Sequence, residues 1–267
     1  MSVGWPIVLA NFAYGLMQSA DRVTVQLTRP IHDFAIYSLA QSMIFVPVNI
    51  IAAVTRVAFS HFARQPHSER RLTYTKTTNS LVLLWFVLLP YFFVTSWLIH
   101  RYIPKYIPGL PAGMILLISV LFLGLISVVQ ANSFTVQGRQ RQYFFGSLAA
   151  VGVAFVTAWI GSHRLNSLSA VAWSQVFTAA LWWLANEWAL RRHQLFDLIG
   201  IARVLGTFAL GCAGLYGAMA LSANLWMQIV LYTAMEMLPA VLLFRAELSE
   251  LVSTAMRFKA KQTLPVG

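Results

Sequence analysis

The chain has 267 residues, of which 58% are hydrophobic and only 10% are charged, and its mean hydropathy is +0.68. A soluble globular domain carries about 25% charged residues, so the composition excludes that class and indicates a helical protein that crosses a membrane several times. The formal net charge of +11 does not indicate a nucleic-acid-binding surface. The basic residues lie in short loops between apolar runs, where they act as orientation signals.

The apolar runs predict an all-α, polytopic transmembrane helical bundle of about eight spans. Each run is close to the roughly 20 residues that cross the hydrocarbon layer. In chain order the spans are expected at 5–27, 37–59, 81–99, 110–136, 143–160, 168–190, 204–221 and 225–244. The third span is almost wholly apolar and is expected to face lipid. The polar segments 64–76 and 191–203 are expected to lie along the membrane surface.

The first span carries a polar stripe along one face. At 100° per residue, Asn11, Gln18, Arg22 and Gln26 fall within a sector of roughly 80°, with Asp21 on its flank. Ionisable residues inside a spanning helix are costly, and they usually face a bundle interior or a watery path for a substrate or an ion. The stripe therefore favours a transporter.

Three further spans repeat this pattern, and a polar cavity shared by the four striped helices is expected. Arg22 and Arg56 would make such a cavity positive, which suits an anionic substrate such as a phosphate, a pyrophosphate or an acidic sugar. The candidate cavity residues are Asn11, Gln18, Asp21, Arg22, Gln26, Gln41, Asn49, Arg56, Gln130, Gln137 and Gln175.

Structural interpretations of the same residues stay open. Polar side chains in spanning helices often join helices by hydrogen bonds, and such a role with a neighbouring helix is the alternative for Asp21 and for Arg22 alike. Arg56 lies toward the inner end of its span, from which a long side chain reaches the headgroups. Glu236, in the middle of the eighth span, is a weak candidate for an ion or proton site. A packing contact is the favoured alternative for Glu236.

Lysine and arginine residues are concentrated in alternate loops. Segments 64–76, 139–141, 191–203 and 245–261 contain thirteen of them, whereas the other loops contain four. The positive-inside rule then places both termini of an eight-span chain in the cytoplasm.

Motifs for catalysis and for cofactor binding are scarce. The six histidines lack a metal-ligand spacing such as H-E-x-x-H, and the lone Cys212 offers no disulfide framework. Neither a G-x-S-x-G elbow nor a phosphate-binding glycine loop occurs. We therefore expect no enzyme, no metal or other cofactor and no nucleic-acid partner. The N-terminus also lacks the basic residues of a cleavable signal peptide.

Four short motifs carry a resemblance to a known family. They are Gly4-Trp5-Pro6 at the start, Asp21-Arg22 in the first span, Tyr37-Ser38-Leu39-Ala40 at the opening of the second, and Gly138-Arg139 after the fourth. In these motifs the chain resembles the second half of Wzx-type flippases for O-antigen and exopolysaccharide. Those proteins belong to the multidrug/oligosaccharidyl-lipid/polysaccharide (MOP) exporter superfamily.

The resemblance implies an architecture of two six-helix lobes around a central cavity. Residues 1–190 would form the second lobe, and residues 191–267 would form a linker, two additional transmembrane helices and a basic cytoplasmic tail. The first lobe would be supplied by a longer form of the protein or by a partner chain.

The resemblance also implies a function. The intact protein would move an undecaprenyl-diphosphate-linked oligosaccharide across the bacterial inner membrane for the biosynthesis of lipopolysaccharide and other surface polysaccharides. Its partners would be that lipid-linked oligosaccharide and membrane lipids. Two alternatives remain: an ion-coupled exporter of drugs or other small molecules in the same superfamily, which a positive cavity disfavours, and a membrane-embedded enzyme of polysaccharide assembly, which needs a large outer loop.

Overall fold

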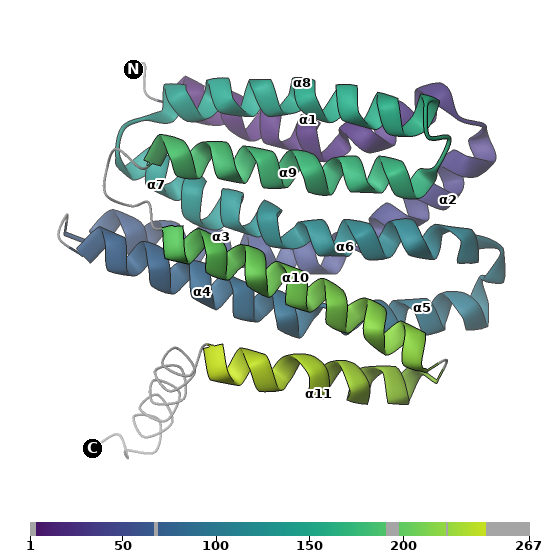
Figure 1. Cartoon of the computed structure of the whole chain (residues 1–267). Coiled ribbons are helices and arrows are strands. Elements are labelled where there is room, and N and C mark those ends of the chain that lie inside the picture. The colour runs from purple at the N-terminus through teal and green to yellow at the C-terminus, as the bar shows by residue number, and fades with distance from the viewer. Residues whose placement is uncertain (1–3, 67–68, 191–197, 223, 244–267) are drawn as a thin grey trace, which may run out of the picture.

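The computed structural model describes residues 4–66, 69–190, 198–222 and 224–243, and every regular element in these ranges is a helix (Figure 1). The elements are α1 (Gly4–Thr28), α2 (Ile31–Ser42), α3 (Phe45–Arg64), α4 (Arg70–Leu88), α5 (Tyr91–Tyr102), the short 3₁₀ helix η2 (Pro104–Gly109), α6 (Leu110–Gly124), the π-helical turn η3 (Leu125–Gln130), α7 (Ala131–Val136), α8 (Gln140–His163), α9 (Leu168–Leu190), α10 (Leu198–Leu221) and α11 (Leu225–Leu243). The predicted all-α class is confirmed. The basic tail and the start of the predicted linker, 191–197, lie outside the described residues.

Six stretches of the described chain are long and apolar enough to cross a membrane. They are Phe45–Arg64, Arg70–Tyr102, Pro104–Val136, Gln140–His163, Leu168–Leu190 and Leu198–Leu221. Helices α1 and α11 coincide with the first and last predicted spans but are not among these six. At 25 residues α1 has the length of a span, but Gln18, Asp21 and Arg22 lower its hydropathy.

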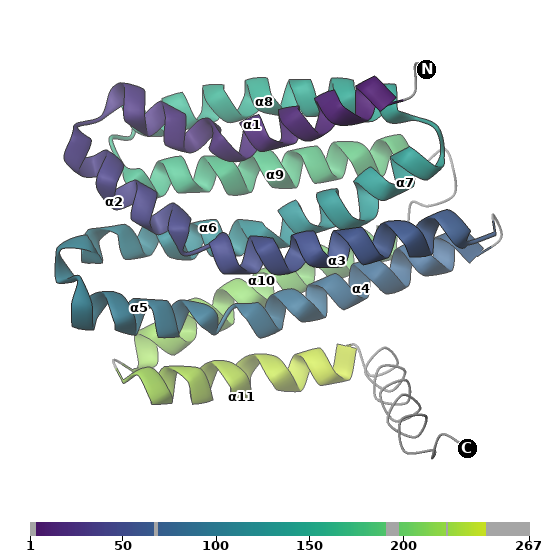
Figure 2. The same cartoon turned by 180° about the vertical axis from the view of Figure 1, so that it is seen from behind.

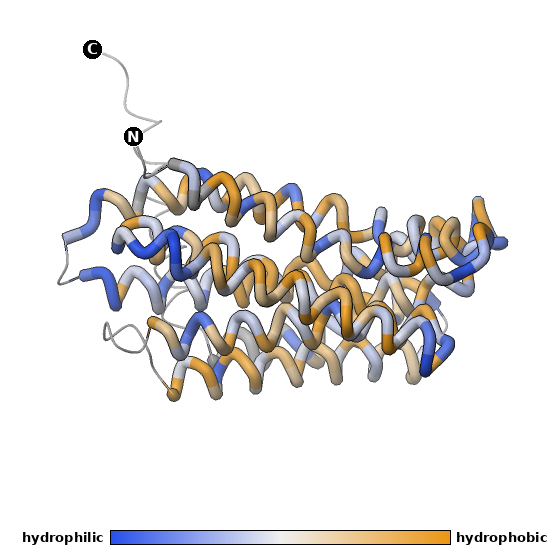
Figure 3. Tube along the Cα trace, turned by 90° about the horizontal axis from the view of Figure 1, so that it is seen from above, coloured by the Kyte–Doolittle hydropathy of each residue, from blue (hydrophilic) through white to orange (hydrophobic). Residues whose placement is uncertain are grey.

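The surface of the bundle has the polarity that a bilayer requires. Hydrophobic residues run along the helices, and hydrophilic residues gather at the two ends of the bundle (Figure 3). Large side chains such as Phe12, Val57, Val156 and Trp188 are exposed on this surface. A soluble monomer rarely exposes contiguous apolar patches of such extent. Hydrocarbon covers such patches in a membrane, so this surface and the six long apolar stretches are those expected of a helical membrane protein.

The loops that the sequence predicts to be basic meet at one end of the bundle. The α3–α4 connection, the α7–α8 connection, the end of α9 and the start of α10 all lie there (Figures 1 and 2). The α1–α2, α5–α6, α8–α9 and α10–α11 connections lie at the opposite end. Charge alternation in the sequence thus corresponds to a physical separation of the basic and the less basic loops.

Helix α6 is the centre of the fold. Its sequence, LPAGMILLISVLFLG, is apolar on every side, and such a helix is stable only when protein or lipid surrounds it fully. Here protein does so, because 94% of the most apolar window in Pro104–Val136 is buried. Figures 1 and 2 show α6 between the α1–α8–α9 layer and the layer formed by α3, α4 and α5.

Small residues bring α1 and α8 close together. Ala10, Ala13 and Ala20 are buried on α1, and Ala154 and Ala158 are buried on α8, which runs alongside it. Small side chains spaced three, four or seven residues apart lie on one helix face and let two backbones approach closely. This close packing in turn fixes which face of α1 points away from the bundle.

Two predicted spans are each two helices rather than one. The expected second span is interrupted at Met43–Ile44, between α2 and α3. Pro47 explains the break, since a proline removes a hydrogen bond to the carbonyl four residues earlier and clashes with it. The expected third span is likewise divided at Leu89–Pro90, between α4 and α5. The polar stretch before this span, 64–76, is also not a separate surface helix, because α4 begins at Arg70 and continues into the apolar segment.

The expectation that the third span faces lipid is wrong for one of its sides. Leu81, Trp85, Phe92 and Phe93 are almost fully buried, since this side meets α6 and the α10–α11 hairpin. Apolar composition alone does not separate a lipid-facing side from a protein-facing side, because both are equally hydrophobic.

A proline-freed carbonyl helps to hold α11 in place. Pro90 has no N–H group, so the carbonyl of Phe86 cannot receive the usual hydrogen bond from the residue four positions later. The Tyr232 hydroxyl on α11 donates to this carbonyl oxygen at 3.1 Å, and its ring meets Phe93 edge to face. An unpaired carbonyl is expensive in a membrane, so this bond favours docking of α11 on the α4–α5 junction.

Close packing of α10 on α4 gives a first testable prediction. A Cβ atom on Gly211 would lie 2.5 Å from Cζ3 of Trp85, which is almost fully buried. We expect Gly211→Leu to lower the free energy of unfolding by about 1–3 kcal/mol, as overpacking does. Gly206→Leu on the same helix is the matched control, since nothing lies within 4 Å of its Cβ position. Thermal unfolding of the detergent-solubilised chain measures both; equal losses would contradict the α10–α4 contact.

Candidate functional site

A buried carboxyl network lies where α1 and α2 meet. Asp21 is only 3% exposed. The Tyr37 hydroxyl donates to its Oδ2 at 2.6 Å, and the Gln41 amide donates to Oδ1 at 3.0 Å and to Oδ2 at 2.9 Å. The backbone N–H of Arg22 donates to Oδ1 at 2.7 Å. Both carboxyl oxygens therefore have partners, as a buried polar group requires.

The local sequence explains how α2 comes to supply these donors. Pro30 follows the end of α1 and turns the chain, so that α2 crosses back beside α1 (Figure 2). Tyr37 and Gln41 are four residues apart and lie on the same face of α2. That face meets Asp21, so Asp21 joins α1 to α2 by hydrogen bonds, as in the structural alternative to a cavity role.

Arg22 lies on the outside of the bundle, whereas Asp21 lies inside it. Adjacent residues on a helix differ by about 100° in direction, and Arg22 is exposed while Asp21 is buried. Its guanidinium lies over the Phe34 ring at 5.5 Å from the centroid. Asn11 and Gln26 are also exposed, and Gln18 is partly exposed. Helix α1 thus presents a polar face, containing one cation, to the outside of the described bundle.

Helix α3 presents a second polar face of the same kind. Asn49 and Arg56 are both exposed and lie seven residues apart, which is close to two helical turns. The Asn49 amide donates to the Phe45 carbonyl at 2.7 Å within the same helix. We call the exposed residues Asn11, Arg22 and Gln26 the α1 polar face, and Asn49 and Arg56 the α3 polar face.

A second buried carboxyl network joins α4, η3 and α9 around Glu187, which is 5% exposed. The Tyr74 hydroxyl donates to Glu187 Oε1, and the Gln130 amide donates to the same oxygen at 3.0 Å. The Gln130 amide also donates to the Trp183 carbonyl, and Asn186 donates to Gln130 Oε1 at 3.0 Å. Gln130 is the last residue of the π-helical turn, a distortion that often marks functional positions.

The remaining candidates occupy separate places. Gln175 on α9 is buried, and neither of its amide atoms has a hydrogen-bond partner. Gln137 follows α7 and is partly exposed, with an unpartnered Oε1. Glu236 on α11 is buried against α10, where its carboxyl group occupies the space that a side chain on Gly214 would need. This is the packing contact that was the favoured interpretation of Glu236, although its Oε2 has no partner.

The structure brings only some of the predicted cavity residues together. Asp21 and Gln41 are in direct contact, whereas Gln130 lies in the other network and Gln175 lies apart from both. The α1 and α3 polar faces are exposed on the outside of the bundle. None of the twelve candidates lines either of two cavities found among the described residues, one beside Glu187 and one between α5 and α10.

Sequence reasoning missed the tyrosines that complete both networks. Tyr37 and Tyr74 are buried donors to Asp21 and Glu187, but Tyr74 lies in a segment expected to be at the surface. Glu187 is also absent from the candidates named from the sequence. A buried carboxyl group needs several hydrogen-bond donors. Because the predicted spans contain few acidic residues, each of these residues was a reason to look for buried donors on the neighbouring helices.

Within the described ranges no three His, Cys, Asp or Glu side chains come together in a way that could hold a metal ion.

Comparisons with protein-family models, with curated proteins and with solved structures find no match for this chain. The class that the fold supports is an all-helical bundle in which six stretches of the described chain are long and apolar enough to cross a membrane.

Proposed function

We propose that this chain is one lobe of a membrane transporter that moves a lipid-linked anionic oligosaccharide across the bacterial inner membrane. The observation that carries the proposal is the exposure of the α1 and α3 polar faces on a bundle whose exposed surface between its two ends is mostly apolar. Contact with lipid is unfavourable for two amide side chains and an arginine on one helix, because placing a charge in hydrocarbon costs several kcal/mol.

A second helical lobe covers these faces in the proposed assembly, whether it belongs to the same polypeptide or to a partner chain. The space between the lobes then becomes the polar transport path, and rocking of one lobe against the other opens it to either side. Arg22 and Arg56 supply the positive charge that binds a diphosphate or an acidic sugar. The resemblance to Wzx-type flippases of the MOP superfamily points to the same substrate, an undecaprenyl-diphosphate-linked oligosaccharide.

The proposal also assigns a membrane topology. With α1 and α11 counted as spans, residues 1–190 form the six-span lobe and residues 191–267 add two helices and a basic tail. The end of the bundle where the basic loops gather faces the cytoplasm, and both termini lie on that side.

Substitution of Arg56 tests this proposal. We expect Arg56→Ala in the intact protein to abolish surface polysaccharide in the host while the amount of the protein in the membrane stays normal. Loss of an exposed cation costs little stability, whereas loss of a substrate contact stops transport. Polysaccharide is measured by gel analysis of surface extracts, and the protein by immunoblot.

Arg64→Ala is the matched control, since Arg64 is also exposed and ends the same helix. We expect normal polysaccharide from that variant. Normal polysaccharide from Arg56→Ala would remove the residue from the path. Unchanged polysaccharide on deletion of the gene, accompanied by altered sensitivity to cationic compounds, would instead favour the drug-exporter alternative.

A further inference from the structure

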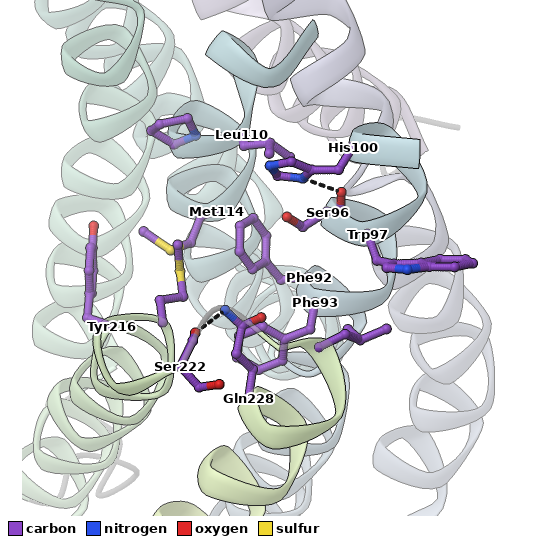
Figure 4. Close-up of a pocket in the computed structure, with 13 residues that line it drawn as sticks. Phe92, Phe93, Ser96, Trp97, His100, Leu110, Met114, Tyr216, Ser222 and Gln228 are labelled. Atoms are coloured by element: carbon purple, nitrogen blue, oxygen red, sulfur yellow. Dashed lines mark hydrogen bonds between the residues drawn. The ribbon is translucent and has the colours of Figure 1, made fainter. Parts of the chain in front are cut away.

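A cavity of about 620 Å³ lies between α5, the start of α6 and the α10–α11 hairpin (Figure 4). Its volume is within the roughly 300–1,000 Å³ typical of small-molecule sites. Phe92 and Phe93 are 1% exposed and Met114 is 3% exposed, so the inner wall is apolar and rigid. It is separate from the carboxyl networks and from the α1 and α3 polar faces.

The cavity has a polar border at the ends of its helices. His100 lies in the last turn of α5, and its Nδ1 is 2.8 Å from the Ser96 carbonyl oxygen. Ser222 directly follows α10, and its carbonyl accepts a hydrogen bond of 2.8 Å from the Gln228 amide on α11. Figure 4 shows the Phe92 and Phe93 rings between His100 on one side and Ser222 with Gln228 on the other.

The same cavity opens on the apolar outer surface of the bundle. Trp97, Tyr216 and Met219 line it and are 39–47% exposed. Tryptophan and tyrosine are enriched where hydrocarbon meets headgroups. Two cations are close to the border in sequence, since Arg101 follows His100 and Lys105 lies in η2. A ligand that enters from this side therefore meets hydrocarbon-like walls first and then the polar border, beside which Arg101 and Lys105 lie in the sequence.

We propose that this cavity binds one acyl chain of an anionic membrane phospholipid, whose phosphate lies at the level of His100 and Arg101. Phospholipid is the amphipathic molecule that surrounds a membrane protein, and arginine and lysine side chains bind phosphate groups by charge-assisted hydrogen bonds. The chain would fill the space between the α10–α11 hairpin and the α5–α6 turn, and so stabilise the hairpin against the bundle. This inference does not depend on the proposed transport function.

Photocrosslinking tests the site on the full chain. The protein is reconstituted into vesicles of phosphatidylethanolamine and phosphatidylglycerol that contain a trace of phosphatidylglycerol with a diazirine in one acyl chain. After illumination, digestion and mass spectrometry locate the adducts. We expect several-fold more adducts on Phe92, Phe93 and Met114 than on the lipid-facing α8 residues Leu148 and Val156, which are 53% and 59% exposed.

Two variants that fill the cavity, Met114→Trp and Ser96→Phe, are each expected to reduce cavity adducts to the α8 level. The matched control is Leu148→Trp, which adds the same bulk on the outer surface and should leave cavity adducts unchanged. Size-exclusion elution identifies the variants that keep the fold. If one of the two cavity variants misfolds, the other still gives the test.

Equal labelling of all exposed apolar surfaces would overturn the site, as would unchanged cavity labelling in correctly folded variants. Loss of cavity labelling when undecaprenyl phosphate is added in a trace amount equal to the probe would assign the cavity to a polyprenyl tail instead and overturn the phospholipid occupant. None of these readouts involves surface polysaccharide, so failure here is distinguishable from failure of the transport proposal.

Discussion

Alanine at Asp21 and alanine at Arg22 are expected to give opposite results, although the two residues are adjacent. Asp21→Ala should destabilise the bundle, because the Tyr37 hydroxyl and the Gln41 amide lose their acceptor in a buried place. Each buried group left unpaired costs about 1–3 kcal/mol. Arg22→Ala should leave the fold intact, since it removes an exposed cation–π contact with Phe34 worth about 0.5–1 kcal/mol.

The effects of the two substitutions on transport should be the reverse of their effects on stability. If the α1 polar face lines a transport path, Arg22→Ala abolishes surface polysaccharide at a normal protein level, whereas Asp21→Ala lowers polysaccharide only in proportion to the protein that remains folded. Thermal unfolding in detergent and immunoblots of host membranes measure the two effects.

Asp21→Asn is the control for the buried partner, because its amide oxygen still accepts from Tyr37 and the loss of stability should be smaller. The structural assignment fails if Arg22→Ala unfolds the protein as readily as Asp21→Ala.

The second large effect is expected at the Glu187 network. Gln130→Leu removes a donor to Glu187 and the acceptor of Asn186 at once. Because Glu187, the Trp183 carbonyl and Asn186 each lose one partner, we expect a loss of about 1–3 kcal/mol in the free energy of unfolding. Gln137→Leu is the matched control: it is partly exposed and its Oε1 has no partner, so little stability should be lost.

A double-mutant cycle makes the test specific. When both partners of a buried hydrogen bond become apolar, the penalty for an unpaired group falls. The variant with leucine at both Gln130 and Glu187 should therefore lose less stability than the sum of the two single changes, with a coupling of about 0.5–3 kcal/mol. Additive losses measured by thermal or denaturant unfolding would show that the two side chains do not interact.

Several features of the fold could be predicted from sequence because they depend on short-range chemistry. The runs of about 20 apolar residues that end in polar loops predict spanning helices. The helix bounds of 168–190 and the end of α10 at Leu221 agree with the structure. The stripe on α1 was visible at helical periodicity, and its residues do share one side, apart from Asp21 on the flank.

The breaks between α2 and α3 and between α4 and α5 were not predicted, because the length of the apolar runs was given more weight than the prolines within them. Pro47 and Pro90 lie inside runs that are hydrophobic enough to span as single helices. Hydropathy counts side chains, whereas the break follows from one missing N–H group and one steric clash in the backbone.

What the sequence by itself determined was the class: an all-α membrane protein with its basic loops in alternation and with polar residues where lipid tolerates few. Only the tertiary structure decided which polar residues are structural and which are exposed. Asp21 found its donors on the next helix, α2, and Gln130 found its partners on the distant helix α9, while Arg22 and Arg56 did not enter the bundle. Helical periodicity gives the direction of a side chain around its own helix. The residues that this side chain contacts depend on how each helix is rotated about its axis within the bundle. That rotation follows from the close contact of α1 with α8 and from the burial of α6.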